Sequence, residues 1–158
     1  MKLHDKIVLV TGGSRGIGKS ISKLFVDEGA QVIITSKNIT KLEQTAKEIN
    51  CSFFIDADIK SEKDVKNAIN KIIEKFGRID ILINNAGILP EQKKLDQINE
   101  NDWNEVLDVD LTGQFRFTKA VIPHMKKNGG SIINMSSDAG LKAFENFYAD
   151  AYVASKAA

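Results

Sequence analysis

Tyr152 and Lys156, within the sequence YVASK, combine residue types and a spacing that could perform acid–base chemistry. Side chains four positions apart lie on the same face of a helix, so the phenol would lie beside the ammonium group. A tyrosine ordinarily has a pKa of about 10, and a neighbouring positive charge stabilises the phenolate and lowers that value. Tyr152 could then exchange a proton with an alcohol or a carbonyl oxygen, which Ser137 could hold by a hydrogen bond. Because this spacing is common on ordinary surfaces, the interpretation depends on the accompanying motifs.

A glycine-rich stretch, TGGSRGIGKS at residues 11–20, directly follows the short apolar run IVLV at residues 7–10. A strand, a glycine turn and a helix in this order present backbone N–H groups and the positive helix end to a phosphate. The stretch fits two binding motifs at once. The triphosphate pattern G-x-x-x-x-G-K-[ST] is matched by Gly13, Gly18, Lys19 and Ser20, and the pattern T-G-x-x-x-G-x-G by Thr11, Gly12, Gly16 and Gly18.

Residues near the ends of the next two apolar runs bear on this choice. A triphosphate site needs an aspartate that holds Mg²⁺, and Asp56 could serve, so the loop alone leaves that alternative open. A dinucleotide site needs a group roughly 20 residues beyond the glycines to meet the adenosine ribose, and Ser36, Lys37 and Asn38 stand there. No carboxylate awaits a free 2′-hydroxyl, whereas Lys37 and Arg15 suit the charge of a 2′-phosphate. We therefore expect NADP(H) in preference to NAD(H).

Short apolar runs alternate with longer segments of helical periodicity, which is typical of a parallel sheet with helices on both faces. Strands are expected at residues 7–10, 31–36, 52–58, 79–85 and 131–137. The expected inward helix positions are Ile17, Ile21, Leu24 and Phe25, then Leu42, Ala46 and Ile49, then Val65, Ala68, Ile69, Ile72, Ile73 and Phe76. The pattern predicts one α/β domain over residues 1–158, a doubly wound parallel sheet of the Rossmann type.

A longer fourth helix is expected over residues 102–127, with Asn99 or Asn101 as its cap and Gly129 and Gly130 after its end. Its expected inward positions are Trp103, Val106, Leu107, Leu111, Phe115, Val121 and Met125. The other conspicuous polar motifs, NNAG at residues 84–87 and the pair Ser136 and Ser137, follow the fourth and fifth predicted strands. Carboxyl ends of parallel strands share one rim of the sheet, so these motifs can converge there with the glycine turn.

The composition excludes several classes of partner. With 42% hydrophobic and 27% charged residues and a net charge of +1, the chain has no basic excess for nucleic acid or an anionic membrane, and we expect a small-molecule partner. The first apolar run is too short for a signal peptide or a membrane span, so we expect a cytoplasmic protein. Cys51 is interpreted as a small buried residue, and His4 and His124 lack neighbours at metal-ligand spacing, so no metal site is expected.

In combination, TGGSRGIG, Asp58-Ile59, NNAG, INMSS and YVASK resemble the short-chain dehydrogenase/reductase family over the entire chain. The resemblance implies that Ser137, Tyr152 and Lys156 are catalytic, with tyrosine as the proton donor in reduction and Lys156 also binding the nicotinamide ribose. It further implies cofactor binding by Gly12, Ser14, Arg15, Gly16, Ile17, Gly18, Ser36, Lys37, Asp58, Ile59, Asn84, Asn85, Ala86, Gly87, Tyr152 and Lys156. The Arg15 and Lys37 pattern resembles NADPH-preferring members, including 3-oxoacyl-[acyl-carrier-protein] reductases. Members are commonly tetramers built on the fourth and fifth helices, so a homo-oligomer, tetramer or dimer, is expected.

Two features inside the chain depart from the family pattern. Asp110 stands in the long fourth helix where the family usually has an asparagine that helps to anchor a proton-relaying water. If its carboxylate pairs with Lys156, it would weaken the field that activates Tyr152, and we expect retained but altered activity. The interval from Ser137 to Tyr152 is slightly longer than usual, which predicts a longer loop over residues 141–150. Tyr148 in that loop has no lysine four residues later.

A third departure is that the sequence stops at Ala158, just after Lys156. The resemblance implies a longer subunit whose further part supplies the last two strands and the segment over the substrate, so we interpret the chain as the N-terminal part of a longer enzyme. The leading hypothesis is an oxidoreductase that transfers a hydride between NADP(H) and a carbonyl or secondary alcohol. The alternatives are a dinucleotide-binding fragment without turnover and a P-loop nucleotide hydrolase, which would leave NNAG and YVASK unexplained.

Overall fold

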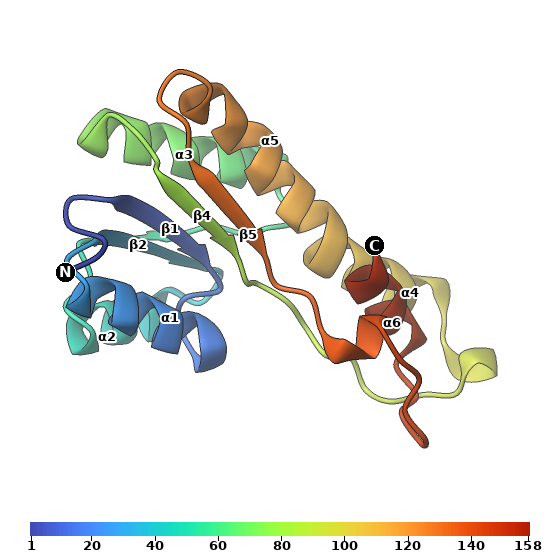
Figure 1. Ribbon diagram of the computed structural model, residues 1–158. Coiled ribbons are helices and arrows are strands. Elements are labelled where there is room, and N and C mark those ends of the chain that lie inside the picture. The colour runs from blue at the N-terminus through green and yellow to red at the C-terminus, as the bar shows by residue number, and fades with distance from the viewer.

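The computed structural model describes residues 1–158 and contains one five-stranded parallel sheet in the order β3-β2-β1-β4-β5 (Figure 1). The strands are β1 (Ile7–Thr11), β2 (Gln31–Ser36), β3 (Phe53–Asp56), β4 (Ile81–Asn84) and β5 (Ser131–Asn134). The strand order reverses between β1 and β4, which confirms the doubly wound topology. The third, fourth and fifth strands are shorter than predicted, because the polar residues beyond each of them leave the ladder and form loops at the sheet rim.

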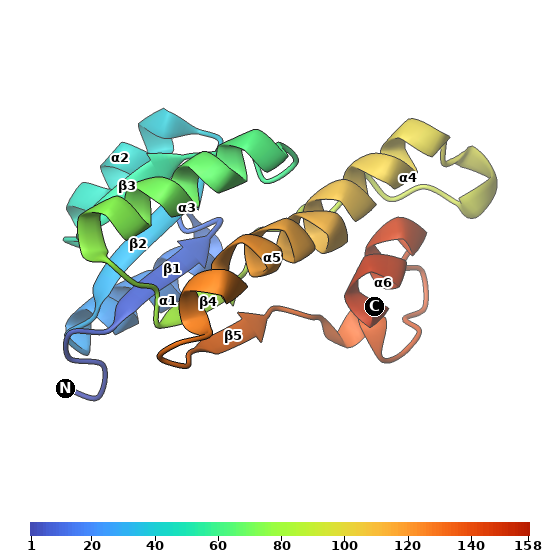
Figure 2. The same cartoon turned by 90° about the horizontal axis from the view of Figure 1, so that it is seen from above.

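Helices cover both faces of the sheet, as predicted (Figure 2). The helices are α1 (Gly16–Asp27), α2 (Ile39–Glu48), α3 (Glu62–Phe76), α4 (Glu100–Leu107), α5 (Gly113–Met125) and α6 (Asp150–Ala157). Successive strand residues point to opposite faces, so each strand contributes to two cores. Leu9 and Ile33 join the core under α3 and α5, whereas Val8 and Val32 join the core under α1 and α2.

The inward faces predicted for α2 and α3 are largely confirmed, because Leu42, Ala46, Ile49, Val65, Ala68, Ile69 and Ile72 are buried. The predicted face of α1 is wrong in part. Ile17 and Leu24 are exposed, and the fully turned-in residues are Gly18 and Ser22. A Cβ at position 18 would lie 2.4 Å from the Gly12 carbonyl oxygen, so this helix approaches the glycine turn closely and its smallest residues face the sheet.

The long fourth helix is interrupted by a π-helical turn, η2 (Asp108–Thr112), between α4 and α5. The extra residue in a π turn rotates everything that follows relative to α4, so the predicted inward face is wrong beyond Leu107. Leu111 is 38% exposed and Phe115 60% exposed, and Val109 and Phe117 are buried instead. The predicted cap is confirmed, because the Asn99 side chain accepts the Asp102 N–H. The π turn also directs Asp110 inward, where its side chain is buried.

Two further observations concern the expectations about partners. No helix combines the length and the apolar character that crossing a membrane requires. Cys51 packs partly buried against the core under α1 and α2, and its thiol donates to the Phe53 carbonyl oxygen at 3.0 Å. Burial raises the pKa of this thiol, so it is a structural residue rather than a reactive one.

Candidate active site

A groove of about 360 Å³ runs along the carboxyl ends of β1, β2 and β4, where the strand order reverses. It is lined by Thr11, Gly12, Ser14, Arg15, Gly16, Ile17, Gly18, Thr35, Ser36, Lys37, Ala57, Asp58, Ile59, Lys60, Asn85, Ala86, Gly87, Ile88 and Val109. The structure therefore brings together the glycine turn, the end of β2, the Asp58-Ile59 pair and most of the NNAG motif. Thr35, Ala57, Lys60, Ile88 and Val109 are lining residues that the sequence motifs did not indicate.

The glycine turn and the NNAG segment are locked together by hydrogen bonds. The Thr11 hydroxyl accepts the backbone N–H groups of Asn85 and Ala86, both at 3.0 Å. In return, the Asn85 amide donates to the carbonyl oxygens of Thr11 and Gly12. Gly12 has a φ of +66°, and a Cβ there would lie 2.9 Å from the Ala86 Cα. The turn thus requires glycine both for its left-handed backbone and for the close approach of the two segments.

The residues specific to the triphosphate motif point away from this groove. Lys19 forms an ion pair with Glu48 on α2, and neither it nor Ser20 lines the groove. The Ser20 hydroxyl instead donates to the Gly16 carbonyl oxygen within α1. The hydrogen bond from Lys19 lowers the pKa of the Glu48 carboxyl. The lysine of a triphosphate site would have to reach into the phosphate cradle, so the structure does not support that alternative.

The end of β2 presents hydroxyl and cationic groups to the groove. Ser36 accepts a hydrogen bond from the Ser14 hydroxyl at 3.1 Å and another from the Asn38 backbone N–H at 3.3 Å. Lys37 and Arg15 are exposed along the same wall. Across the groove, the Asp58 carboxylate accepts the Lys60 backbone N–H at 2.9 Å, which fixes the Asp58-Ile59 loop. No acidic side chain lines the groove at the end of β2, in agreement with the sequence there.

Asn84 differs from the other residues of its motif, because it is fully buried and does not line the groove. Its amide donates to the Thr118 hydroxyl on α5 at 3.0 Å and to the Asn134 side chain on β5 at 2.8 Å. Asn84 therefore joins the sheet to the helix behind it. A direct cofactor contact, which the resemblance implies, is not made available by this placement, and the roles of Thr118 and Asn134 had no signal in the sequence.

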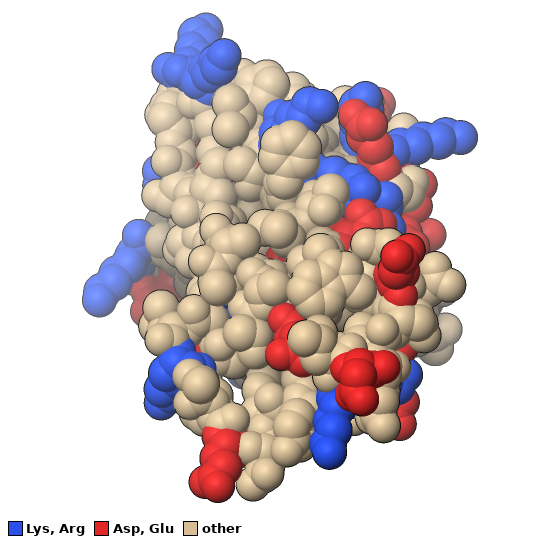
Figure 3. Space-filling model, turned by 90° about the vertical axis from the view of Figure 1, so that its right-hand side faces the viewer, with Lys and Arg blue, Asp and Glu red and all other residues tan.

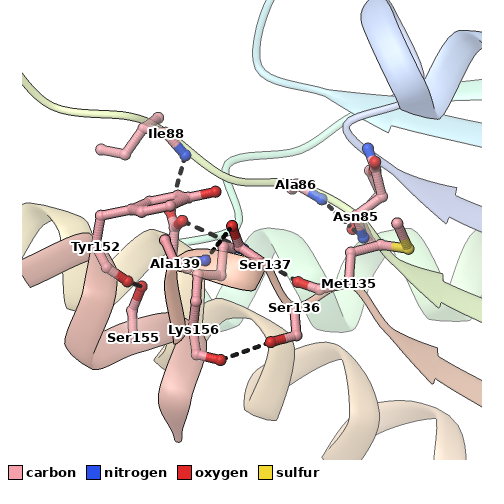
Figure 4. Close-up of polar contacts among 12 residues, drawn as sticks. Asn85, Ala86, Ile88, Met135, Ser136, Ser137, Ala139, Tyr152, Ser155 and Lys156 are labelled. Carbon is pink, nitrogen blue, oxygen red and sulfur yellow. Dashed lines mark hydrogen bonds and ion pairs between the residues drawn. The ribbon is translucent and has the colours of Figure 1, made fainter. Parts of the chain in front are cut away.

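Tyr152, Lys156 and Ser137 lie at the end of the groove, as Figure 4 shows. The Lys156 ammonium group is 5.5 Å from the centre of the Tyr152 ring, so the predicted stacking on one helix face is present in α6. Ser137 caps the short 3-10 helix η3 (Asp138–Gly140), where its hydroxyl accepts the Ala139 N–H at 3.2 Å. The Tyr152 ring extends from α6 toward the segment that carries Ser137 (Figure 4). The hydroxyl and the phenol thus come from separate elements that face one space.

Lys156 is held by groups on two other elements. Its ammonium group donates to the Met135 carbonyl oxygen at 3.1 Å and lies 3.4 Å from the Asp110 carboxylate. Asp110 in turn accepts the Ile88 backbone N–H at 2.8 Å. The side chains of Lys156 and Asp110 are only 6% and 0% exposed. Burial raises the pKa of the Asp110 carboxyl, against the opposing effects of the Ile88 hydrogen bond and of the Lys156 charge.

Two residues that the sequence did not single out fix α6 against the rest of the site. The Ser136 hydroxyl donates to the Lys156 carbonyl oxygen at 2.6 Å. A Cβ on Gly140 would lie 2.4 Å from that same carbonyl oxygen, so only glycine allows η3 to pack so closely on α6. These contacts place the backbone of Lys156 directly beside the segment after β5.

The loop over residues 141–149 carries aromatic side chains toward the catalytic tyrosine. Phe147 packs edge-on against the Tyr152 ring with the ring centres 6.4 Å apart, and Phe144 packs against Phe147 at 6.1 Å. Tyr148 lies apart from this row: its carbonyl oxygen accepts the Lys93 backbone N–H at 3.0 Å, and it lines a separate cavity between the 88–98 loop and α4. The structure therefore separates Tyr148 from the lysine that accompanies Tyr152, as the sequence suggested.

The lateral face of the molecule that carries α4 and α6 is shown in Figure 3. Charged side chains lie mainly toward its edges, while uncharged atoms cover much of the middle. This distribution differs from the cofactor groove, where Arg15, Lys37 and Lys60 are among the lining residues. The two parts of the site therefore present different surfaces to a ligand.

Comparison with known proteins places these features in a family. A family model described as short chain dehydrogenase matches residues 6–158. Among curated proteins, L-fucose dehydrogenase from Bos taurus is 37% identical over 153 residues, covering 97% of this chain and 56% of the relative. The 3-oxoacyl-[acyl-carrier-protein] reductase of Thermotoga maritima is 38% identical over 164 residues, covering 99% of this chain and 65% of the relative.

Solved structures agree. A short chain dehydrogenase from Mycobacterium smegmatis superposes with a TM-score of 0.93 at 31% identity, covering 99% of this chain and 67% of that one. The crystal structure of gox2181 superposes with a TM-score of 0.95 at 28% identity, covering 99% and 63%. The chain thus spans between about half and two thirds of the length of the curated relatives it matches, such as the two above at 56% and 65%.

Proposed function

The chain belongs to the short-chain dehydrogenase family, and on that premise we propose that it forms the cofactor-binding and catalytic part of an oxidoreductase acting on a carbonyl or secondary alcohol with NADP(H). The observation that carries the proposal is the position of Tyr152, with the Lys156 ammonium 5.5 Å from its ring centre, at the end of a glycine-lined groove. A structural lysine and tyrosine would need neither the glycine turn nor the buried hydrogen bonds that hold Lys156.

A nicotinamide dinucleotide fits the residues present. The left-handed Gly12 and Gly16 leave backbone N–H groups free of side-chain cover at the start of α1, which suits a pyrophosphate. No side-chain cap occupies the start of α1. When bound, the nicotinamide ring would supply the hydride acceptor or donor. Gly12, Ser14, Arg15, Gly16, Ile17 and Gly18 would hold the phosphates, and Asp58 and Ile59 would lie near the adenine.

The acid–base step is assigned to residues of the chain itself. Tyr152 donates a proton to the carbonyl oxygen in reduction and takes it from the alcohol in oxidation. Ser137 holds that oxygen by a hydrogen bond from its hydroxyl, which requires it to turn from its present partner, the Asp138 carboxylate at 3.3 Å. Lys156 stabilises the phenolate form of Tyr152 and has N–H groups beyond the one bound to Met135 for a ribose hydroxyl.

The preference for NADP(H) over NAD(H) rests on the end of β2. Ser36, Lys37 and Arg15 line the groove there, and no carboxylate is present to bind a free 2′-hydroxyl. A 2′-phosphate would gain charge-assisted hydrogen bonds from these cations. The exposed positions of both cations leave them free to close on such a group.

Self-association is the proposed quaternary arrangement. Leu111, Phe115 and Ile122 form an exposed apolar stripe from η2 along α5, at 38%, 60% and 40% exposure. Apolar side chains arranged along one helix face are characteristic of helix-to-helix contacts between subunits. We propose that copies of the protein associate through this stripe, as a dimer or a tetramer.

The proposal is tested with the purified protein by following NADPH absorbance against a panel of small carbonyl compounds, including sugar lactones and 3-oxoacyl thioesters. We expect NADPH to be consumed in a one-to-one ratio with the alcohol formed, and NADH to be used less efficiently. Tight binding of NADPH without oxidation by any carbonyl compound would instead support a dinucleotide-binding protein without turnover. Binding of Mg-ATP in preference to either dinucleotide would overturn the proposal.

A further inference from the structure

Asp110 is a buried acidic residue beside the catalytic lysine, and the proposed reaction does not require a charge at that position. The carboxylate comes from the π turn η2, and its side chain is completely enclosed. One oxygen, Oδ1, accepts the Ile88 N–H, whereas Oδ2 has no hydrogen-bond partner and lies 3.4 Å from the Lys156 nitrogen. An orphaned carboxylate oxygen that faces a buried ammonium group is expensive to maintain unless its charge is used.

The space for this pair is created by glycine in the NNAG motif. A Cβ on Gly87 would lie 3.0 Å from Oδ2 of Asp110 and 3.4 Å from Nζ of Lys156. Gly87 therefore lets the backbone run past both charged groups while it continues to line the cofactor groove. The π turn and this glycine together place a carboxyl group one ammonium away from the phenol of Tyr152.

We propose that Asp110 is a positioning residue that controls the charge acting on Tyr152: in its ionised form the carboxylate cancels the Lys156 ammonium, and in its protonated form it leaves that charge uncompensated. The inference rests on the proposed function, since it concerns the proton step assigned to Tyr152. A phenolate next to a compensated lysine is less stable than one next to a lone ammonium group. Tyr152 therefore accepts the alcohol proton only at a higher pH than it would beside a neutral amide.

The other charged groups around Asp110 leave Lys156 as its principal partner. On α6 the facing ionisable groups are Lys156 and Tyr152, and Lys156 is the only charged group that shifts the pKa of the Asp110 carboxyl. On its own helix, Asp108 is paired with Arg116 at 2.7 Å toward the surface. The segment after β4, from Asn85 to Ile88, contributes no charged side chain. On η3 the nearest acidic residue is Asp138, which is paired with Lys142 at 3.7 Å.

The test compares pH–rate profiles of alcohol oxidation for the wild-type protein and for Asp110→Asn, which removes the charge at nearly constant volume. We expect the pH at half-maximal kcat to fall by about one unit in the variant, because the lone Lys156 ammonium then favours the phenolate. The KM for NADP should change little, since Asp110 does not line the cofactor groove. Asp108→Asn is the matched control: it removes the same charge from the same helix turn, and its profile should coincide with that of the wild type.

An unshifted profile in an active Asp110→Asn variant, or an equal shift in Asp108→Asn, would overturn the inference while leaving the proposed function intact. Failure of the wild-type protein to oxidise any alcohol would instead count against the proposed function. If Asp110→Asn does not fold, Asp110→Ser removes the charge at smaller volume and is judged by the same shift. Independently of turnover, ¹³C NMR of the labelled aspartate carboxyl carbons should show one group, absent in the variant, that titrates well above ordinary surface aspartates. Its absence would overturn the inference too.

Discussion

The two ends of the groove solve the binding of charge in opposite ways. At the glycine turn, the groups available to a ligand are backbone N–H groups and exposed cations, and the nearest ion pair, Lys19 with Glu48, lies outside the groove. At the other end, Lys156 and Asp110 are buried and depend on one another and on single backbone groups. Substitutions in the first region should therefore change how tightly and which cofactor binds, whereas substitutions in the second should change the chemical step and its response to pH.

The largest expected effect is at Tyr152, which breaks the chemical end of the comparison. Tyr152→Phe removes the proton donor and should lower kcat by about 10²–10⁴-fold, with little change in NADPH affinity. Steady-state kinetics and a fluorescence titration with NADPH measure the two quantities. Tyr148→Phe is the control, since Tyr148 lines a different cavity without Lys156. Equal losses of kcat in both variants would contradict the assignment.

The next effect is at Gly12, in the cofactor-binding region. Gly12→Ala places a Cβ 2.9 Å from the Ala86 Cα in a left-handed backbone, so it should destabilise the fold by about 1–3 kcal/mol and abolish NADPH binding. Gly77→Ala carries similar left-handed strain at the end of α3, with no atom near its added Cβ. If thermal unfolding shows the two variants equally destabilised and both still bind NADPH, the close packing of the turn against NNAG is not what the site requires.

Sequence motifs predicted the cofactor region well because its determinants are local. Strand β1, the glycine turn and α1 are consecutive, and β2 begins and ends at the predicted residues, Gln31 and Ser36. The doubly wound order follows from the alternation of strands and helices. Within α1, periodicity alone placed Ile17 and Leu24 inward, because it carries no information on how closely the helix approaches the turn at Gly18.

The catalytic region was predicted only in part, because its geometry depends on tertiary contacts. The helical spacing of Tyr152 and Lys156 was sufficient to foresee their stacking. The π turn at Asp108–Thr112 has no periodic signal, so the exposure of Phe115 could not be inferred. The brace from Asn84 to Asn134 and the contact of Ser136 with Lys156 join segments 50 and 20 positions apart, a separation that no motif encodes.

A smaller effect sharpens the cofactor side of the comparison. Lys37→Ala removes a cation at the end of β2 and should weaken NADPH binding about tenfold, with NADH binding nearly unchanged, as expected for loss of a charge-assisted contact to the 2′-phosphate. Titration of both dinucleotides by fluorescence gives the ratio. Lys19→Ala removes an equal charge that is turned toward Glu48, and it should alter neither affinity. A parallel weakening of NADH binding by Lys37→Ala would mean that this lysine does not read the 2′-position.

The smallest expected effect concerns stability, and it separates buried from exposed charge. Burial raises the folded-state pKa of Asp110, so its favourable contribution is present below the ordinary aspartate value and is lost as the pH rises through the raised value. Asp110→Asn has no such loss, and its unfolding free energy relative to wild type should therefore increase from pH 4 to pH 8, by about 1 kcal/mol. Urea unfolding at several pH values measures this difference, in which the other titrating groups cancel. Asp108→Asn, at the surface pair with Arg116, should change stability only slightly. A relative stability of Asp110→Asn that falls as the pH rises would show that the attraction of Lys156 outweighs the cost of burial, and that Asp110 is ionised throughout the working range.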